Sequence, residues 1–348
     1  MGGFLTAIFY IIVMVIVFGV LIFIHELGHF FTARRCKVTI NEFAVGMGPK
    51  IASWNSKKYN TKYSIRALPI GGYVSMAGED EASDDENAFC NKKVWQRMLI
   101  TIAGPMMNLL LGLVLMFCVV LMQGPIGSTT IADFNDNATS IAKLEVGDEI
   151  TKIGSTPVRS GNEAYYEIMM KGIEPVDVTV IRNGEEIVLK GVVFPTIEEE
   201  GTRFGDMDFK VLAEERTFFN IISQTFTRSV STVKMVFDSL IGIFNGRFGL
   251  DAVSGPIGAA EVVGEAAKTD TMTLFYVVSV FSINLGIFNL IPFPALDGGR
   301  FILLAIEGIR RKPIDKKIEG YINFAGIVFL LAFMLFISFK DVLKLIFR

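Results

Sequence analysis

The chain has 348 residues, of which 51% are apolar and 20% charged, and its mean hydropathy is +0.48. This composition excludes an ordinary soluble enzyme and indicates a membrane protein. The net charge of −3 and the lack of a long basic run argue against a nucleic-acid partner, and three cysteines without a paired spacing argue against a disulfide-stapled secreted fold.

The first 33 residues form an apolar segment that ends in a histidine motif. Residues 1–24 carry no charge, and the apolar run Phe4–Ile24 is longer than the apolar core of a signal peptide, so we predict a retained transmembrane helix. The helix continues into His-Glu-Leu-Gly-His at residues 25–29. Positions i and i+4 of a helix share a face, so both imidazoles can reach one cation. The chain has no other histidine, and ionisable groups at membrane depth are costly and functional by default.

This motif predicts zinc-dependent hydrolysis. In the usual arrangement His25 and His29 bind Zn2+, a third protein ligand completes the set, and the fourth position holds a water whose pKa falls to about 7. Glu26 then takes the proton and delivers it to the leaving amine. If Arg34 marks the cytoplasmic interface, His25 lies roughly 13 Å inside it at 1.5 Å per residue. The alternative is a chance occurrence of the motif at a helix end.

A loop rich in basic residues, 34–97, separates the first two apolar segments. Within it, residues 63–76 alternate in polarity around Gly71 and Gly72. Paired glycines supply the positive φ angles of a tight turn, so we predict a β-hairpin that turns at these two residues.

A second transmembrane helix is predicted at residues 98–122. It contains one amide side chain in its first half, Asn108. We expect Asn108 to serve helix packing beside Gly104 and Pro105.

Residues 123–205 have the composition of a small soluble domain. Two strand-like runs flank an Asn-Gly turn within 176–189, which predicts a hairpin. The segment 141–150 resembles the Ala-Gly-Leu-x-x-Gly-Asp segment of PDZ domains, but it departs from that pattern at Lys143 and at Val146. We therefore predict a PDZ-like α+β domain, and both peptide capture and a non-binding steric filter fit the sequence.

The linker 206–271 contains an amphipathic pattern. Phenylalanines and aliphatic residues recur at helical spacing within 217–248, with Ser, Thr and Lys between them. This pattern predicts an amphipathic helix on the outer membrane surface.

The third zinc ligand must be a carboxylate or a cysteine, because no third histidine exists. Asp297 fits best, since it ends the third apolar segment, 272–299, after two prolines that break the helix. Broken backbone at membrane depth is tolerated only where it is packed in protein or lines a wet cavity. The alternative is that Asp297 caps a following helix, Arg300–Gly308. Glu307 and Cys118 are weaker ligand candidates.

A second basic loop, 300–320, precedes a fourth transmembrane helix at 321–347. Both basic loops are expected in the cytoplasm, which places the N-terminus and residues 123–271 outside. Three basic residues near the C-terminus oppose this orientation. The predicted fold is a polytopic α-helical membrane protein with four transmembrane helices, a membrane-associated β-hairpin and one inserted extracytoplasmic PDZ-like α+β domain.

Over most of its length the chain resembles the site-2 protease family of intramembrane metalloproteases, specifically the single-PDZ form of the bacterial regulator-of-sigma proteases. The motifs that carry the resemblance are residues 25–29, Leu296-Asp297-Gly298, residues 68–74, residues 104–108 and residues 254–258. The resemblance implies that His25, His29 and Asp297 bind zinc. It also implies that Glu26 is the catalytic base and that Asn289 stands near the scissile bond. The amide of Asn289 can donate to an oxyanion, with an interhelical hydrogen bond as its alternative role.

The resemblance further implies regulated intramembrane proteolysis in a bacterial cell membrane. Expected substrates are membrane-spanning proteins such as anti-sigma factors or remnant signal peptides. The family implies a hairpin that dips into the membrane, and our hypothesis is that one of its strands holds the unwound substrate; a hairpin on the cytoplasmic surface is the alternative. Two other functions are the alternatives. A catalytically inactive membrane scaffold would predict a degraded metal site, and a transporter would predict paired repeats. The sequence has neither feature.

Overall fold

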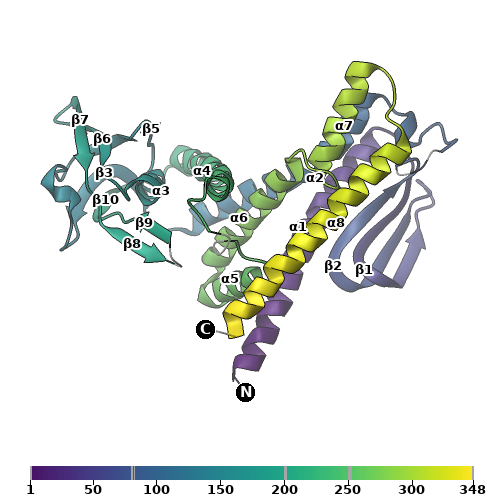
Figure 1. Cartoon of the computed structure of the whole chain (residues 1–348), viewed down its shortest axis with the longest axis horizontal. Helices are drawn as coiled ribbons and strands as arrows, with labels where there is room; N and C mark the ends of the chain where they lie inside the picture. Colours follow the sequence, from purple (N-terminus) through teal and green to yellow (C-terminus); the bar gives the residue numbers. More distant parts are fainter. Residues whose placement is uncertain (1, 80, 82, 200–201, 250–252, 347–348) are drawn as a thin grey trace. The chain divides into compact units, whose positions relative to one another are not determined.

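The computed structural model describes residues 2–79, 81, 83–199, 202–249 and 253–346, and Figure 1 shows the course of the chain. The helices are α1 (Gly2–Arg35), α2 (Val94–Met122), α3 (Gly161–Lys171), α4 (Phe218–Phe244), α5 (Pro256–Thr269), α6 (Thr271–Leu290), α7 (Asp297–Arg310) and α8 (Lys316–Ile346). The strands are β1 (Ile40–Asn55), β2 (Lys62–Met76), β3 (Ile126–Phe134), β4 (Glu149–Ile153), β5 (Thr156–Pro157), β6 (Val176–Arg182), β7 (Glu185–Val192), β8 (Thr196–Glu199), β9 (Thr202–Gly205) and β10 (Phe209–Glu214).

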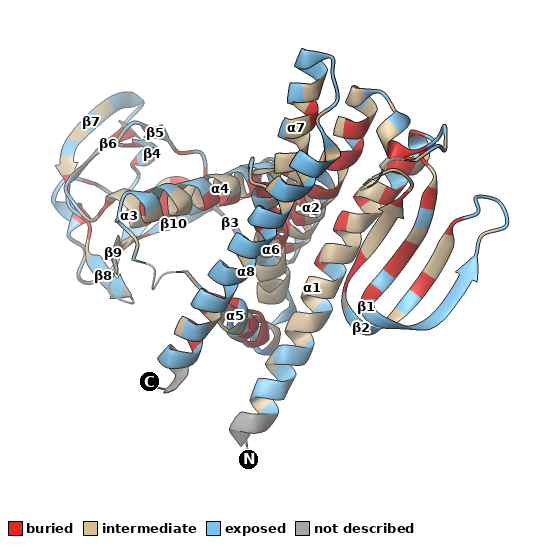
Figure 2. Cartoon of the chain, turned by 45° about the vertical axis from the view of Figure 1, so that its right-hand side comes forward, coloured by how far each residue is buried: buried red, intermediate tan, exposed pale blue. Residues whose placement is uncertain are grey.

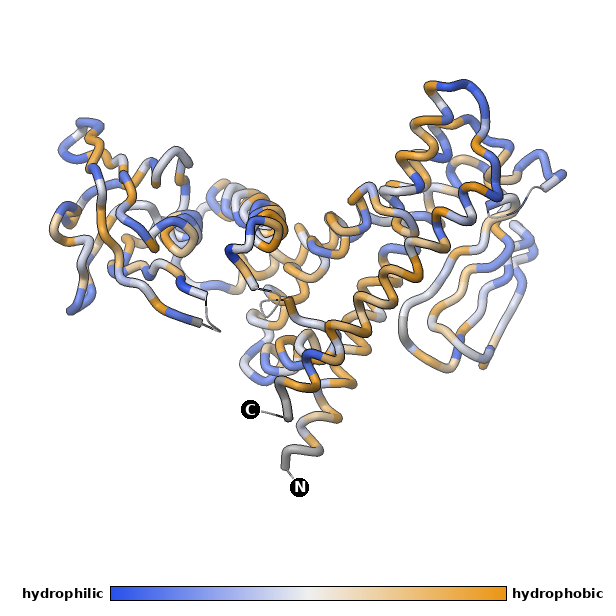
Figure 3. The backbone as a smooth tube through the Cα atoms, viewed as in Figure 1, coloured by the Kyte–Doolittle hydropathy of each residue, from blue (hydrophilic) through white to orange (hydrophobic). Residues whose placement is uncertain are grey.

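Four helices of the described chain are long and apolar enough to cross a membrane, as predicted. They are Leu5–Arg35 of α1, Val94–Met122, Thr271–Leu290 and Lys316–Leu343 of α8. Helices α1 and α8 are mostly apolar (Figure 3), and much of their surface is exposed (Figure 2). Ile12 is 53% exposed and Leu335 is 67% exposed. Such surfaces are costly in water and are solvated by lipid, so the chain is a multi-pass membrane protein. The predicted extension of the last helix to Phe347 lies outside the described residues.

The chain forms two compact units. Met1–Leu115 and Ser254–Arg348 make the first, which we call the helical unit. Met116–Val253 make the second, the inserted unit, which contains β3 to β10 with α3 and α4. A separate unit is therefore inserted between the second and third membrane helices.

Within the helical unit, α2 packs closely against α1 and α6. A Cβ added at Gly28 of α1 would lie 2.7 Å from the carbonyl carbon of Ala103, so the two backbones touch. Two buried serines of α6 donate hydrogen bonds of 2.7 Å to carbonyls of α2, Ser279 to Gly112 and Ser282 to Asn108. Small residues and buried interhelical hydrogen bonds are the contacts expected between helices in lipid.

Strands β1 and β2 form an antiparallel sheet of two long, bent strands. Residues 42–45 of β1 pair with residues 72–75 of β2 and also with residues 62–65 of the same strand. The expected hairpin within 63–76 is therefore one strand, and its partner precedes it in the chain. Gly71 has a φ of 74° and bends β2 at the point where the sequence predicted a turn. The residues of alternating polarity on the two sides of this bend belong to one strand. The sequence pattern therefore predicts two paired strands where the structure has one bent strand.

Strand β2 lies beside the apolar part of α1. A Cβ added at Gly19 would lie 2.5 Å from the carbonyl oxygen of Pro69, and one added at Gly71 would lie 3.2 Å from Cγ2 of Ile22. Gly19 precedes His25 by six residues, which is about 9 Å along the helix. The bend of β2 therefore lies beside the membrane-spanning part of α1. Along the helix axis it is further from Arg35, the end of α1, than His25 and His29 are.

The inserted unit is built on a sheet with strand order β10-β3-β4-β6-β7. The predicted hairpin is confirmed as β6 and β7, which are joined by Asn183 and Gly184 with φ angles of 53° and 85°. The sheet continues past residue 205, the boundary expected from the sequence, because β10 pairs with β3 and its Phe209 is 2% exposed in the core.

Helix α4 of the inserted unit is amphipathic, as its pattern predicted. Its exposed face carries large apolar side chains, including Phe226 and Phe237, whereas Gln224, Ser229 and Thr232 are buried. The polar and small residues therefore face protein, and the apolar residues face the surroundings.

Candidate functional site

Both histidines of the chain lie on α1, one turn apart, and both are largely buried. Their shared face meets α2 at Gly104. A Cβ added at Gly104 would lie 2.7 Å from Nε2 of His25 and would also meet Nε2 of His29. Glycine at this position therefore keeps open the space toward which both Nε2 atoms point.

The Nδ1 atoms of both imidazoles also meet α2. Nδ1 of His29 lies 2.8 Å from the carbonyl oxygen of Ile100, and Nδ1 of His25 lies 3.2 Å from Nδ2 of Asn108. A carbonyl oxygen can only accept, so Nδ1 of His29 donates to Ile100. Nε2 of a neutral His29 then presents a lone pair to the open space.

Asp297 reaches the same space from the other end of the sequence. Helix α6 ends at Leu290, and after a short segment with two prolines α7 begins at Asp297. A Cβ added at Gly298 would lie 2.5 Å from the carbonyl carbon of Leu290, so this connection is tightly folded. The N-cap residue of α7 is Leu296, without a side-chain cap. Asp297 therefore does not cap the helix, which was the alternative interpretation of this residue.

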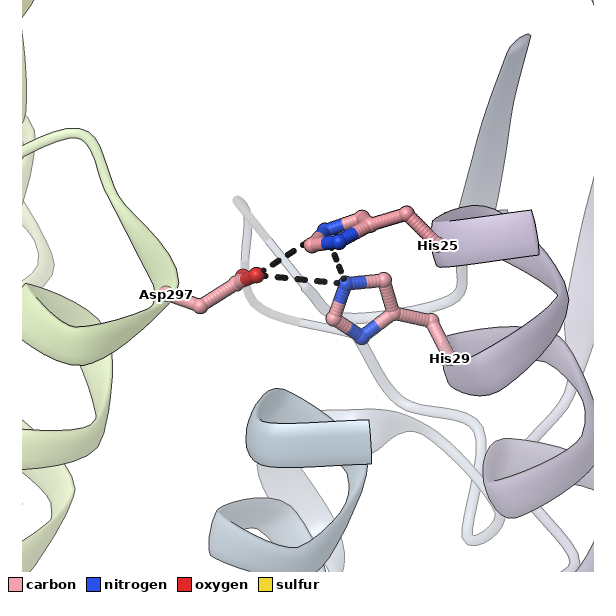
Figure 4. Close-up of side chains that lie close together, drawn as sticks. All are labelled: His25, His29 and Asp297. Atoms are coloured by element: carbon pink, nitrogen blue, oxygen red, sulfur yellow. Dashed lines mark hydrogen bonds and ion pairs between the residues drawn. The ribbon is translucent and has the colours of Figure 1, made fainter. Parts of the chain in front are cut away.

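Figure 4 shows the three side chains converging. Oδ2 of Asp297 lies 3.0 Å from Nε2 of His25 and 3.5 Å from Nε2 of His29. The two Nε2 atoms are 3.1 Å apart. One donor atom from each residue thus lies within 4.8 Å of the others.

This donor set fits a tetrahedral zinc ion. With metal–ligand bonds of about 2.0–2.1 Å, tetrahedral geometry places the donor atoms about 3.3 Å apart. The three separations of 3.0, 3.1 and 3.5 Å lie around that value. Two imidazole nitrogens and a carboxylate are also a common donor set for zinc, and Gly104 leaves room beside them.

A cavity of about 220 Å³ opens at this cluster. Glu26, Tyr73, Val74 and Arg300 are among the residues that line it together with the three converging side chains. Oε2 of Glu26 accepts a hydrogen bond of 3.1 Å from the backbone N–H of Val74 in β2. Strand β2 therefore holds the carboxylate of Glu26 at the cavity.

The other candidate residues from the sequence lie elsewhere. Asn289 is half-buried in the last turn of α6 and is not among the residues that line the cavity. Glu307 forms a two-point ion pair with Arg97. Cys118 follows Gly104 by fourteen residues on α2, which is about 21 Å along the helix axis.

Sequence reasoning missed the part that α2 plays at this site. It assigned Asn108 to helix packing, whereas the side chain of Asn108 contacts His25. The available signal was the spacing of Gly104 and Asn108, which places both on one helix face.

The chain is similar to known proteins over nearly its whole length. The family model described as peptidase family M50 matches residues 13–333. A protein of Clostridium acetobutylicum is 35% identical over 335 residues, which cover 96% of this chain and 97% of that protein. The regulator of sigma-W protease RasP of Bacillus subtilis is 30% identical, covering 96% of this chain and 98% of that protein. The zinc metalloprotease RasP of Geobacillus kaustophilus is also 30% identical, with 96% and 98% covered.

These matches confirm the family, the enzyme class and the zinc dependence that were predicted from the sequence. They extend far beyond the histidine motif and include the hairpin, the inserted unit and α7. The chain belongs to peptidase family M50 and is an intramembrane zinc metalloprotease.

Proposed function

We propose that His25, His29 and Asp297 are the zinc ligands and that Glu26 is the general base, in hydrolysis of a peptide bond within a membrane-spanning segment of another protein. The convergence of three donor atoms within 4.8 Å carries this proposal. Asp297 is distant in sequence from both histidines, so chance helical spacing cannot explain the cluster.

The residues around the cluster have separate chemical tasks. Bound zinc supplies a Lewis acid that polarises the scissile carbonyl and lowers the pKa of water. The carboxylate of Glu26 takes a proton from the attacking water and passes it to the leaving amine. The N–H of Val74 orients that carboxylate at 3.1 Å. Low exposure of the histidines limits access of bulk water.

Asn289 is our candidate for the oxyanion donor. Its amide makes no hydrogen bond within the described part of the chain, so the alternative of an interhelical bond lacks a partner there. A free NH₂ group near the end of α6 can donate to the tetrahedral intermediate when substrate is bound. Asn289→Ala should lower kcat by about 10²–10³-fold with bound zinc unchanged; equal kcat would remove this role.

Strand β2 is our candidate for holding the unwound substrate. Tyr73, Val74 and Met76 line the cavity, and β2 lies beside the apolar part of α1. Extended pairing exposes substrate carbonyls that a helix hides in its own hydrogen bonds. Ser75→Pro should reduce cleavage of a helical substrate more than that of a short, unstructured one, and equal losses would discard the pairing idea.

We further propose that the two basic loops face the cytoplasm and that the N-terminus and the inserted unit lie outside, since basic residues are concentrated in those loops. The exposed apolar face of α4 fits docking on the outer membrane surface. A cysteine introduced at Asn183 should react with an impermeant reagent in intact cells, and one introduced at Lys57 only after lysis. The reverse pattern would invert the orientation.

The inserted unit is, in our proposal, a PDZ-like steric filter that admits substrates whose outer part is already short. Nζ of Lys143, which departs from the PDZ pattern, donates to the carbonyl of Gly191 at 2.8 Å. Gly205 of β9 packs against Gly172 after α3, where an added Cβ would lie 2.8 Å from Cα. This contact leaves no room for an added peptide strand between them.

Anti-sigma factors and remnant signal peptides are the substrate classes we expect. A substrate with a folded outer domain should be cut only after truncation.

The central test compares wild type with Glu26→Gln and His25→Ala, each as the full chain in detergent micelles with a synthetic transmembrane peptide. Glu26→Gln keeps the size of the side chain but loses the proton acceptor, so cleavage should fall by about 10²–10⁴-fold while bound zinc stays at wild-type level. His25→Ala should lose zinc. Wild-type cleavage by Glu26→Gln would remove Glu26 as the base, and full zinc retention by His25→Ala would remove the ligand set.

A further inference from the structure

Asn108 of α2 is a fully buried polar residue in contact with the cluster, with an exposed fraction of 0%. Its Nδ2 lies 3.2 Å from Nδ1 of His25. Its Oδ1 is buried and has no hydrogen-bond partner among the described residues. An unpaired buried amide oxygen costs about 1–3 kcal/mol, so this oxygen is an acceptor available to a donor that reaches it.

A metal ligand at Nε2 changes what Nδ1 of His25 requires. A neutral imidazole that gives the Nε2 lone pair to a cation carries its proton on Nδ1, and this N–H needs an acceptor. Rotation of the Asn108 amide by 180° about χ2 exchanges Nδ2 and Oδ1. The unpaired oxygen then accepts a hydrogen bond from the Nδ1–H of His25, and the NH₂ group moves to the other side.

Helix α2 already supplies the equivalent acceptor to the other histidine. The carbonyl of Ile100 accepts from Nδ1 of His29 at 2.8 Å. The backbone of Asn108 is fixed as well, because its carbonyl accepts a 2.7 Å hydrogen bond from Ser282 of α6. Both imidazoles are thus fixed from α2, one by a main-chain oxygen and one by a side chain on a held backbone.

We infer that Asn108 is a positioning residue of the zinc site, which accepts a hydrogen bond from the Nδ1–H of His25 and so aims Nε2 at the ion. The inference rests on the ligand set proposed above. Partners of this kind fix the tautomer and ring orientation of a histidine ligand, and their loss weakens metal affinity by about 10–100-fold.

The experiment measures zinc affinity of the full chain in detergent micelles by competition with a chelating indicator, together with the visible absorption of the Co²⁺-loaded protein. Asn108→Leu keeps the approximate volume and removes the acceptor. Asn108→Asp keeps an acceptor oxygen. Ser279→Ala is the matched control, because it removes a buried hydrogen bond of 2.7 Å between α6 and α2, at Gly112, without contacting a histidine.

We expect Asn108→Leu to lose about 10–100-fold in zinc affinity and to shift the Co²⁺ spectrum, whereas Asn108→Asp retains wild-type affinity or exceeds it. Ser279→Ala should lower the melting temperature without changing either readout. Unchanged zinc affinity in Asn108→Leu would overturn the inference, as would equal losses in Asn108→Leu and Asn108→Asp. Zinc retention by His25→Ala would instead refute the ligand set, so the two failures are distinguishable.

Discussion

Replacing Gly104 with alanine tests the site most directly, because it fills the space between α2 and the two imidazoles. The added Cβ would lie 2.7 Å from Nε2 of His25 and would meet Nε2 of His29 as well. Optimal non-bonded contacts are about 3.5 Å or longer, so the His25 ring must move by about 0.8 Å. The obstruction falls on the atoms that are proposed to bind zinc.

The magnitude follows from that displacement. A misplacement of about 1 Å at a reacting centre costs about 10²-fold in rate, so Gly104→Ala should lower kcat/KM at least that far and reduce zinc affinity. The intrinsic stability of helix α2 should increase, because alanine is about 1 kcal/mol more favourable than glycine inside a helix. Loss of zinc without a loss of helix stability is the expected signature.

The assay measures bound zinc, peptide cleavage and melting temperature for Gly104→Ala beside Gly112→Ala. An added Cβ at Gly112 would lie 2.5 Å from Cγ1 of Ile283, so this control disturbs the packing of α2 on α6 without touching a histidine. It should lower the melting temperature and retain zinc. If Gly104→Ala bound zinc and cleaved peptide like wild type, the geometry proposed for the metal site would be refuted.

Two further predictions concern carboxylates outside the cluster. Burial raises the pKa of Glu42, but hydrogen bonds from its neighbours in the hairpin sheet outweigh burial and lower the pKa to about 2. Because this lies below the unfolded value of about 4.3, the charged carboxylate stabilises the sheet at neutral pH, and this contribution is lost as the pH falls from about 4 toward 2. Glu42→Gln should abolish that pH dependence in the fluorescence of Trp54, and an unchanged acid transition would contradict it. Asp341 of α8 accepts from the backbone N–H groups of Gly255 and Gly258 at 2.9 and 3.2 Å, at the start of α5. Asp341→Ala should cost about 1–2 kcal/mol of stability, seen as a lower melting temperature, with a smaller loss in Asp341→Asn; an unchanged temperature in both would show that the cap contributes nothing.

The membrane helices and the cluster were predictable because their signals are local or chemically rare. Long apolar runs predict spans by length alone, and the described helices match all four. Asp297 could be chosen from the sequence because a carboxylate after a broken apolar helix needs a partner at that depth. Its convergence with His25 and His29 is a long-range contact that only the fold reveals.

The hairpin shows where local reasoning fails. Alternating polarity on both sides of a glycine pair is typical of two strands joined by a tight turn. It is equally typical of one strand that bends at the glycines. Strand β1 pairs with two separate parts of β2, and the bend between those parts packs on α1 near Gly19. Register is a tertiary property here, because neither strand alone specifies which segment it meets.

The role of Asn108 depends on the register of two helices, which explains why sequence reasoning assigned it to packing. His25 faces Asn108 and His29 faces Ile100, so positions ascend along α1 while they descend along α2. Gly104 lies between these two contacts and lets the helices approach at the Nε2 atoms. A slip of α2 by one turn would carry Asn108 about 5.4 Å away from His25 and bring a bulky side chain into the space that Gly104 leaves open. Contact residues recur every four positions on both helices, at His25 and His29 on α1 and at Ile100, Gly104 and Asn108 on α2, so the packing of the helices is coupled to the metal geometry. Any change that shifts α2 along α1 should therefore appear first as weakened zinc binding.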